Sequence, residues 1–157
     1  MLFIECHRIL KPGGTFALST WYNENWITIV RDALSQLPGL PFWPQTSDEL
    51  ISTWSQGPWE NPHYVQAMLH RKGFVDIDVK IKSITIELKD ANDFYEVYDA
   101  FIEWVCDRYW TEEEKRVCKP LLRDVVVGYF EKKFGAGKAF GIEKVCILAT
   151  AKKGVVV

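Results

Sequence analysis

The sequence predicts an α/β domain with about three strands and several packed helices. Segments with the 3.6-residue apolar period of helices alternate along the chain with shorter segments typical of strands. Two of the strand-like segments, residues 16–18 and 145–149, are apolar without interruption, which is typical of strands covered on both faces. The length of 157 residues suits one domain, so we expect a single domain over residues 1–157.

The first third of the chain is predicted to run helix, strand, helix. Residues 2–10 form a helix that ends at Pro12, because proline cannot continue a helix and the following glycines allow left-handed turns. The stretch "TFALSTW" is a short strand, and "NENWITIVRDALSQL" is an amphipathic helix. The prolines of "PGLPFWP" break this helix and begin an irregular connector.

Cap residues mark the helices that follow. Ser47 could start a short helix in "SDELISTW", and Asn61 is the N-cap of a helix with Pro62 at its first position that ends at Gly73. Asp90 caps another helix, and Thr111 to Glu114 form a capping box that opens the last long helix.

The two later strands have different patterns. The strand after Gly73 alternates from Val75 to Ile81 and then changes phase at Ile84, which predicts a bulge or sharp bend near Lys82 and Ser83. After the flexible turn "FGAGKAFG", the stretch "IEKVCILATAKK" is predicted to be a central strand.

Composition excludes several classes of function. The net charge is −2 and no basic patch is visible, which argues against nucleic-acid binding. No apolar run approaches the ~20 residues that span a bilayer, and the short apolar start before Glu5 is not a secretory signal. The four cysteines lack metal-ligand spacing, so we expect no metal site and free, mostly buried thiols in a reducing compartment. The prediction is a cytoplasmic protein.

The order of these segments resembles part of a known family. "ECHRILKPGGTFALSTW", followed by "NPHYVQAMLHRKGFVDIDVK" and a terminal "VCILATAKK", is similar to the C-terminal, substrate-side half of S-adenosylmethionine-dependent methyltransferases with the Rossmann-like fold. This resemblance implies a truncated methyltransferase-like domain with the family's strand order fifth–seventh–sixth, in which the last strand is antiparallel and inserts between the other two.

The resemblance also has a gap. The family's first strand ends in a Gly-rich loop that approaches the cofactor, and an acidic residue after the second strand holds the ribose. The chain begins after the positions of both, and "FGAGKAFG" lies between a helix and a strand rather than between a strand and a helix. The resemblance therefore implies no cofactor-binding residues, no bound cofactor and no methyl transfer by this chain alone.

The fifth strand of the family normally pairs with a fourth on its outer edge. Here that edge is expected to be open and apolar, and open edges favour association. We expect a homodimer through this edge or through exposed helix faces, unless the aromatic segment 38–60 folds back over it.

The candidate site residues are mostly aromatic. The chain has seven tryptophans, and the segments that build substrate pockets in the resembled family are rich in them. One interpretation is an apolar cage for a small molecule of secondary-metabolite type; the other is that most of these residues simply fill the core. The substrate-binding candidates are Trp21, Tyr22, Trp26, Trp43, Trp54, Trp59, Tyr64 and Tyr98.

Acid–base candidates are few. His63 lies beside the Asn-Pro helix start and could act as acid or base, although a surface or cap-associated histidine explains it as well. Glu60 could accept a proton. No Ser-His-Asp, metal or phosphate-loop constellation appears in the sequence.

Two classes of function remain open, with a simpler alternative. The first is an enzyme derived from a methyltransferase that shapes an apolar substrate for a cofactor-free cyclisation, cycloaddition or isomerisation, of the kind a pericyclase or isomerase performs. The second is a non-catalytic partner or regulatory half-domain of a methyltransferase. The chain could also be a fragment of an ordinary small-molecule methyltransferase.

Overall fold

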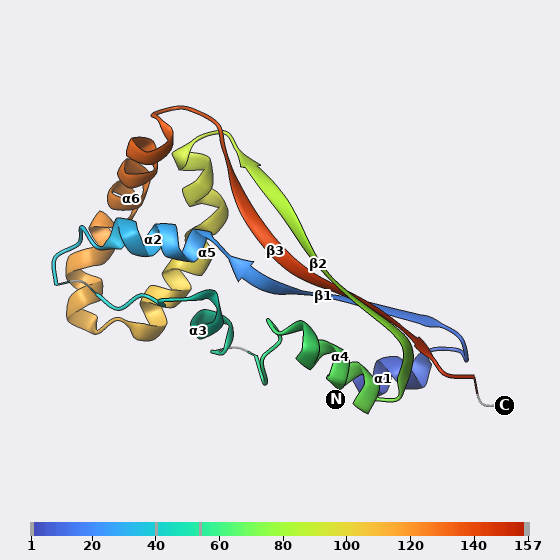
Figure 1. Ribbon diagram of the computed structural model, residues 1–157. Helices are drawn as coiled ribbons and strands as arrows, with labels where there is room; N and C mark the ends of the chain where they lie inside the picture. The colour runs from blue at the N-terminus through green and yellow to red at the C-terminus, as the bar shows by residue number, and fades with distance from the viewer. Residues whose placement is uncertain (1, 40, 54, 156–157) are drawn as a thin grey trace. The chain divides into compact units, whose positions relative to one another are not determined.

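The computed structural model describes residues 2–39, 41–53 and 55–155 (Figure 1). The elements follow in the order α1 (Leu2–Ile9), β1 (Thr15–Glu24), α2 (Trp26–Leu34), α3 (Ser47–Ile51), α4 (Pro62–Arg71), β2 (Phe74–Leu88), α5 (Ala91–Tyr109), α6 (Glu112–Phe134) and β3 (Phe140–Lys153). They fall into two compact units. Unit 1 comprises Met1–Glu24, Leu50–Ile84 and Lys144–Val157, and unit 2 comprises Asn25–Glu49 and Thr85–Glu143.

The strands form one three-stranded sheet in the order β1-β3-β2. β1 and β3 are antiparallel, with Thr15 opposite Lys152 and Ser19 opposite Leu148, and β2 runs against β3 in Figure 1. The predicted α/β class and the predicted central position of the last strand are therefore confirmed. The strand order also agrees with the fifth–seventh–sixth order that the family resemblance implied.

The core of unit 1 lies on one face of this sheet. Ile147, Ala149 and Ala151 alternate along β3 and are buried against Val65 and Leu69 of α4. Partly buried residues of α1 and β1 join this cluster, among them Phe3, Phe16 and Leu18. The opposite face carries the other residues of the alternation, and here Leu148 is 42% exposed. Helices thus cover one face of the unit 1 sheet more than the other.

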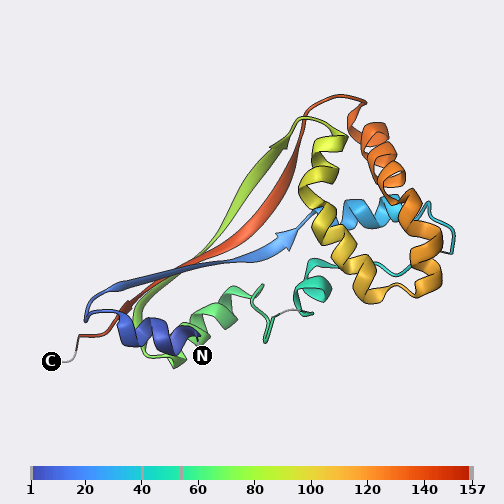
Figure 2. The same cartoon turned by 180° about the vertical axis from the view of Figure 1, so that it is seen from behind.

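Unit 2 is built mainly from helices. The long helices α5 and α6 pack on each other, and α2 packs on α6, as Figure 2 shows from behind. Large side chains of all three helices are fully or almost fully buried and form its core: Trp26, Val30, Phe94, Tyr98, Ile102, Leu122, Val126 and Phe130.

The predicted helix caps are confirmed. The Asn61 side chain accepts hydrogen bonds from the backbone of His63 and Tyr64, and Asp90 caps α5 in the same way. Thr111 and Glu114 exchange both bonds of the capping box. α3 begins at Ser47 as predicted, but the Thr46 hydroxyl accepts the Glu49 amide at 3.2 Å.

Several boundaries differ from the prediction. α2 ends at Leu34 rather than at Leu37, and β3 begins at Phe140, inside the predicted turn. β1 continues to Glu24, which lies opposite Lys144, so α2 starts only at Trp26. The reason is that pairing with β3 satisfies the backbone hydrogen-bonding groups of residues 23 and 24, which the apolar period had assigned to the helix. A register shift lies between Trp21 and Asn23 of β1. The predicted bulge at Lys82 and Ser83 stays a prediction, since β2 runs through this point as one strand.

The change of phase in β2 has a structural counterpart. It falls next to the boundary between the two units, between Ile84 and Thr85. Phe74 is buried in unit 1, whereas Leu88 is buried in unit 2. Because the two ends of β2 contribute to different cores, one unbroken alternation of apolar and polar residues would not bury apolar side chains in both cores.

Candidate functional site

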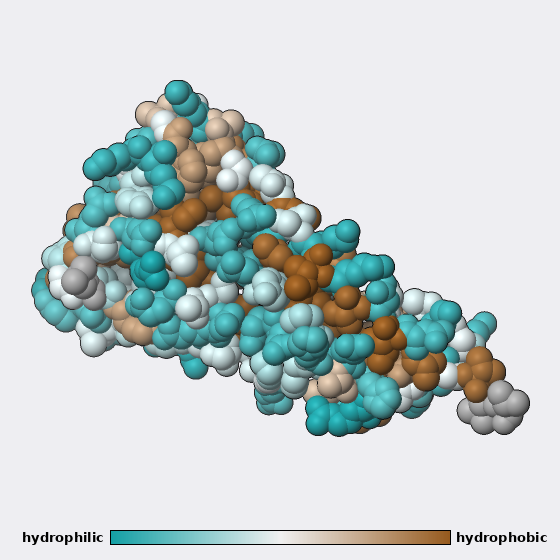
Figure 3. Space-filling view, viewed as in Figure 1, coloured by the Kyte–Doolittle hydropathy of each residue, from teal (hydrophilic) through white to brown (hydrophobic). Residues whose placement is uncertain are grey.

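A hollow of about 700 Å³ lies on the more exposed face of the unit 1 sheet. We name it the Trp21 hollow. β1 contributes Trp21 and Ser19, and β3 contributes Cys146 and Leu148, which lie opposite them in the ladder. Figure 3 shows hydrophobic residues gathered along the region of the strands. The lining residues are Ser19, Thr20, Trp21, Lys82, Ser83, Ile84, Cys146 and Leu148.

An ion pair lies beside Trp21 at the wall of this hollow. The Lys144 ammonium lies 4.4 Å from the centre of the Trp21 ring, within the range of a cation–π interaction. The same ammonium pairs with Glu24 at 3.1 Å, and the two side chains are only 14% and 11% exposed. These interactions fix Trp21 between a charged pair and the hollow. The Cys146 thiol donates to the Lys82 carbonyl at 3.4 Å and joins β3 to β2 at the same place.

A second hollow, of about 250 Å³, lies on the helix-covered face of the same sheet. We name it the Trp59 hollow. Phe3 of α1 stacks on Trp59 with ring centres 5.3 Å apart and planes 7° apart, and Tyr64 meets Trp59 edge-on at 5.3 Å. The indole N–H of Trp59 donates to the Gln56 carbonyl. Its lining residues are Phe3, Phe16, Leu18, Ser19, Thr20 and Trp59.

The two hollows meet at β1. Both are lined by Ser19 and Thr20, which are neighbours on a strand and therefore point to opposite faces. β1 is an outer strand of the sheet, so each hollow reaches the same sheet edge from its own side.

Three aromatic candidates lie instead in the core of unit 2. Trp26, Trp43 and Tyr98 are 2%, 3% and 2% exposed. Trp26 lies 5.0 Å from Tyr98 and 6.2 Å from Trp43, measured between ring centres. The indole N–H of Trp43 donates to the Ile27 carbonyl at 2.9 Å. This packing agrees with the interpretation that they fill a core, and a role in substrate binding stays a prediction.

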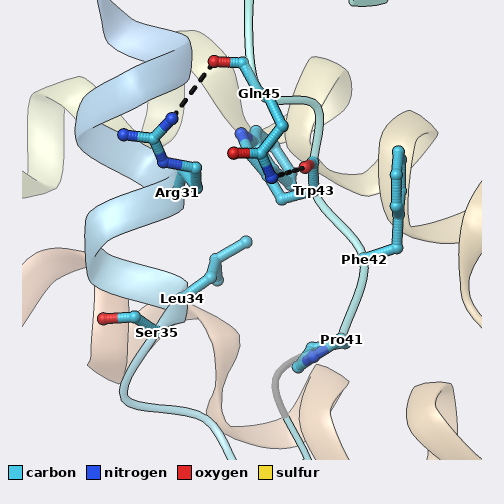
Figure 4. A pocket seen from close by; sticks show the side chains of 7 residues that line it. All are labelled: Arg31, Leu34, Ser35, Pro41, Phe42, Trp43 and Gln45. Atoms are coloured by element: carbon cyan, nitrogen blue, oxygen red, sulfur yellow. Dashed lines mark hydrogen bonds between the residues drawn. The ribbon is translucent and has the colours of Figure 1, made fainter.

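A separate hollow of about 300 Å³ lies over Trp43 (Figure 4). The Arg31 guanidinium donates to the Gln45 carbonyl at 3.1 Å and pairs with Asp32 at 3.2 Å. The side-chain amide of Gln45 donates to the backbone carbonyl of Trp43 at 3.4 Å. Local backbone and side-chain partners thus use the polar groups at this hollow, which consequently offers less to a ligand than the Trp21 hollow does.

The acid–base candidates lie near the Trp59 hollow in sequence. His63 is exposed at the start of α4, where its backbone amide donates to Asn61, and Glu60 is partly buried. In the sequence, Trp59 directly precedes Glu60 and Tyr64 directly follows His63. Tyr22 is 41% exposed beside Trp21 on β1, and Trp54 lies outside the described residues. The catalytic roles of His63 and Glu60 stay predictions.

The cysteines behave as the composition predicted. All four are free, and Cys106, Cys118 and Cys146 are buried. Burial raises the pKa of the Cys106 thiol to about 12, and burial likewise raises the pKa of Tyr95 to about 12. Both groups therefore stay protonated at neutral pH. Across the described part of the chain, no cluster of metal-ligating side chains is present and no helix is long and apolar enough to cross a membrane.

Sequence reasoning missed several residues of the two hollows. Phe3, Phe16 and Leu148 were recognised as apolar but not as lining, because periodicity does not tell a covered sheet face from an uncovered one. Lys144 gave no signal, since its pairing with Glu24 depends on the ladder between β1 and β3.

The comparisons with known proteins find methyltransferases. No family model matches the chain. It is 29% identical over 152 residues to the methyltransferase tpcH of Aspergillus fumigatus, covering 95% of this chain and 52% of that protein. It is 30% identical over 150 residues to the acetylaranotin bis-thiomethyltransferase of Aspergillus terreus, covering 95% and 53%. The methyltransferase ktnA of Aspergillus niger is 28% identical over 153 residues, covering 95% and 48%.

Solved structures give weaker similarities. Phosphoethanolamine N-methyltransferase 2 of Haemonchus contortus aligns with a TM-score of 0.41 and 16% identity over 98% of this chain and 29% of its own. A putative methyltransferase of Bacillus halodurans aligns with a TM-score of 0.38 and 19% identity over 98% and 57%. The chain spans about half the length of the curated relatives it matches. The resemblance read from the sequence is confirmed: this chain is a homologue of methyltransferases over about half of their length.

Proposed function

We propose that this chain binds an apolar small molecule of secondary-metabolite type in the Trp21 hollow and holds it for a reaction that needs no cofactor. The observation that carries the proposal is the hollow itself. Its volume of about 700 Å³ lies within the ~300–1,000 Å³ common for small-molecule sites. Among its lining residues, Trp21, Ile84 and Leu148 offer apolar surface.

The polar lining residues of this hollow come from the two outer strands: Ser19 and Thr20 from β1, and Lys82 and Ser83 from β2. The Ser19 hydroxyl can orient a ligand, and Lys82 brings an ammonium group to the lining. An apolar ligand with one acceptor or negatively charged group fits this distribution. The acetylaranotin bis-thiomethyltransferase of A. terreus acts, by its name, on a small molecule, which supports the same substrate class here.

The proposal includes that these 157 residues alone transfer no methyl group. The sequence contains no strand followed by a Gly-rich turn and a helix, the arrangement with which related folds approach a nucleotide cofactor. A cyclisation, cycloaddition or isomerisation needs mainly orientation of the substrate, which a shaped apolar hollow supplies. His63 and Glu60 lie beside Trp59 in the sequence rather than at the Trp21 hollow, so a ligand in the Trp21 hollow would be oriented without them.

Two alternatives have support of their own. The outer edge of β1 favours a non-catalytic partner that docks on a methyltransferase through this strand. The coverage of about half of each relative favours a substrate-side part of an ordinary small-molecule methyltransferase. Both retain a ligand hollow at Trp21, but the second requires methyl transfer when the remaining half is supplied.

A fluorescence titration with 1-anilinonaphthalene-8-sulfonate tests the hollow. This probe combines apolar rings with one sulfonate, and we expect Trp21→Ala to weaken its binding about tenfold, since loss of an aromatic contact costs about 1–2 kcal/mol. Trp104→Ala is the matched control, because Trp104 on α5 is also 37% exposed. Equal binding by all three proteins would overturn the site.

Calorimetric titration with S-adenosylmethionine tests the second part of the proposal. We expect no binding at micromolar concentrations. Micromolar binding to the purified chain would instead support the methyltransferase alternative, whatever the result at Trp21.

A further inference from the structure

We propose that the ligand of the Trp21 hollow is an organic anion, with its negative group at Lys82 and its apolar part against Trp21. The inference rests on the proposed function and deepens it, because it names the charge of the ligand and the direction in which the ligand lies across the sheet.

Three lining residues form a row across the sheet at this hollow. Trp21 of β1 lies opposite Cys146 of β3 in the antiparallel ladder. The Cys146 thiol in turn donates to the Lys82 carbonyl at 3.4 Å, which brings Lys82 of β2 level with Cys146. Because β3 is the middle strand, the backbones at Trp21 and Lys82 lie two strand spacings apart, about 9–10 Å. A ligand that reaches both residues therefore lies across the strands.

The surface between these two residues is apolar. Cys146 and Leu148 follow each other on one face of β3, and both line the hollow. Leu148 is 42% exposed, and Ile84 of β2, another lining residue, is 44% exposed. A ligand that covers these side chains would remove their apolar surface from water, so the middle of the ligand is expected to be apolar.

The charge of the lining is positive. Of the described lining residues, Lys82 is the charged one. Within residues 2–39, 41–53 and 55–155, no carboxylate pairs with its ammonium. The Lys144 ammonium beside Trp21 is already paired with Glu24 at 3.1 Å. A negative group on the ligand would thus be attracted to Lys82, whereas a cationic ligand would be repelled.

A lysine on an outer strand also has a general role, because it discourages pairing between sheet edges. Lys80, two residues earlier on β2, fits that role: it pairs with Asp78 and lines neither the Trp21 hollow nor the Trp59 hollow. Lys82 differs from Lys80 in both respects. Lys80 is therefore the matched control for a specific role of Lys82.

Equilibrium dialysis with three probes of one shape tests the charge of the ligand. 2-Naphthoate is an anion, 2-naphthamide is neutral and 2-naphthylmethylammonium is a cation, and all three carry the same ring system. We expect the parent chain to bind 2-naphthoate about two- to fivefold more tightly than 2-naphthamide, since an ion pair at an exposed position contributes modestly. The cation should bind more weakly than either, and high salt should reduce these differences.

Substitutions at Lys82 test the position of the anion. Lys82→Met should abolish the preference for 2-naphthoate and leave the affinity for 2-naphthamide unchanged, whereas Lys80→Met should keep the preference. Lys82→Glu should invert it, so that 2-naphthylmethylammonium becomes the tightest of the three probes. A variant that merely misfolds would not gain affinity for the cation.

Two results would overturn the inference. Equal binding of the three probes by the parent chain excludes selection of an anion at this hollow. A preference for 2-naphthoate that Lys82→Met retains excludes Lys82 as the anchor.

Trp21→Ala separates this inference from the proposed function. If Trp21→Ala weakens the binding of all three probes while Lys82→Met changes none of their ratios, the hollow binds ligands but does not select them by charge. If Trp21→Ala changes the binding of no probe, or if the parent chain binds none of them, the hollow itself fails as a site and the inference fails with it.

Discussion

The ion pair beside Trp21 allows a quantitative prediction, in which Lys144→Met removes the positive charge and keeps most of the aliphatic stem. In the structure the ammonium lies 3.1 Å from Glu24 and 4.4 Å from the centre of the Trp21 ring. Both charged side chains are nearly buried, so water replaces little of what the substitution removes.

The expected cost follows from these contacts. Removing one member of a buried pair costs about 3–5 kcal/mol, and a partly exposed cation–π contact adds about 0.5–1 kcal/mol. Each side chain keeps about a tenth of its surface in water, which weakens both interactions, so we expect less than this sum, about 2–4 kcal/mol of unfolding free energy. Lys144→Met combined with Glu24→Gln should cost about 1–2 kcal/mol less than the sum of the single changes.

Urea unfolding at pH 7 of the parent, the two single variants and the double variant measures this coupling. Lys152→Met is the matched control on the same strand. Lys152 pairs with Asp76 at 3.2 Å, but their side chains are 51% and 66% exposed, so we expect a change within about 0.5 kcal/mol. The reasoning is refuted if Lys144→Met costs no more than Lys152→Met, or if the two changes at the buried pair are additive.

Three further predictions concern the two units separately. Raising the pH from 9 to 12 should lower the unfolding free energy of unit 2. Burial raises the pKa of Cys106 from 9.0, and that of Tyr95 from 10.0, to about 12. The unfolded chain therefore loses these two protons at lower pH than the folded chain does, and a rising pH favours unfolding. Urea unfolding across this range measures the slope, which should become smaller in Cys106→Ala; an unchanged slope contradicts the role of the thiol. Thr111→Ala should lower the unfolding free energy by about 1 kcal/mol, since it removes the hydroxyl that accepts a hydrogen bond from the Glu114 amide. Urea unfolding followed by helical circular dichroism measures this loss. An unchanged unfolding free energy would show that the cap is dispensable. Gly57→Ala should destabilise unit 1 by about 1 kcal/mol more than Gly39→Ala destabilises unit 2. Both glycines have positive φ, but only a Cβ at residue 57 would collide with the Tyr64 hydroxyl. Equal costs of the two substitutions in thermal unfolding would contradict that contact.

Local signals predicted most of the secondary structure. The caps at Asn61, Asp90 and Thr111 depend on hydrogen bonds within three residues, so the sequence identifies them directly. The central position of β3 followed from its uninterrupted apolar run. The end of β1 did not follow in this way, because pairing with residues more than a hundred positions later decides it.

The candidate site shows the same limit. Trp21 and Trp59 were chosen for residue type, and the structure places each at a hollow of unit 1. Trp26, Trp43 and Tyr98 were chosen on the same grounds, yet they pack in the core of unit 2. Residue type is the same in both cases, so by itself it does not separate an aromatic side chain in a core from one at a hollow.

The sheet order also has a consequence for synthesis. β3 is central in space, but it follows β1 and β2 along the chain. While the ribosome is still making α6, neither earlier strand has its native neighbour, and their apolar residues are open to wrong partners. The Lys153 ammonium, which donates to the Leu10 carbonyl just after α1 at 2.9 Å, arrives later still. Nascent chains should therefore depend on chaperone protection until β3 has emerged.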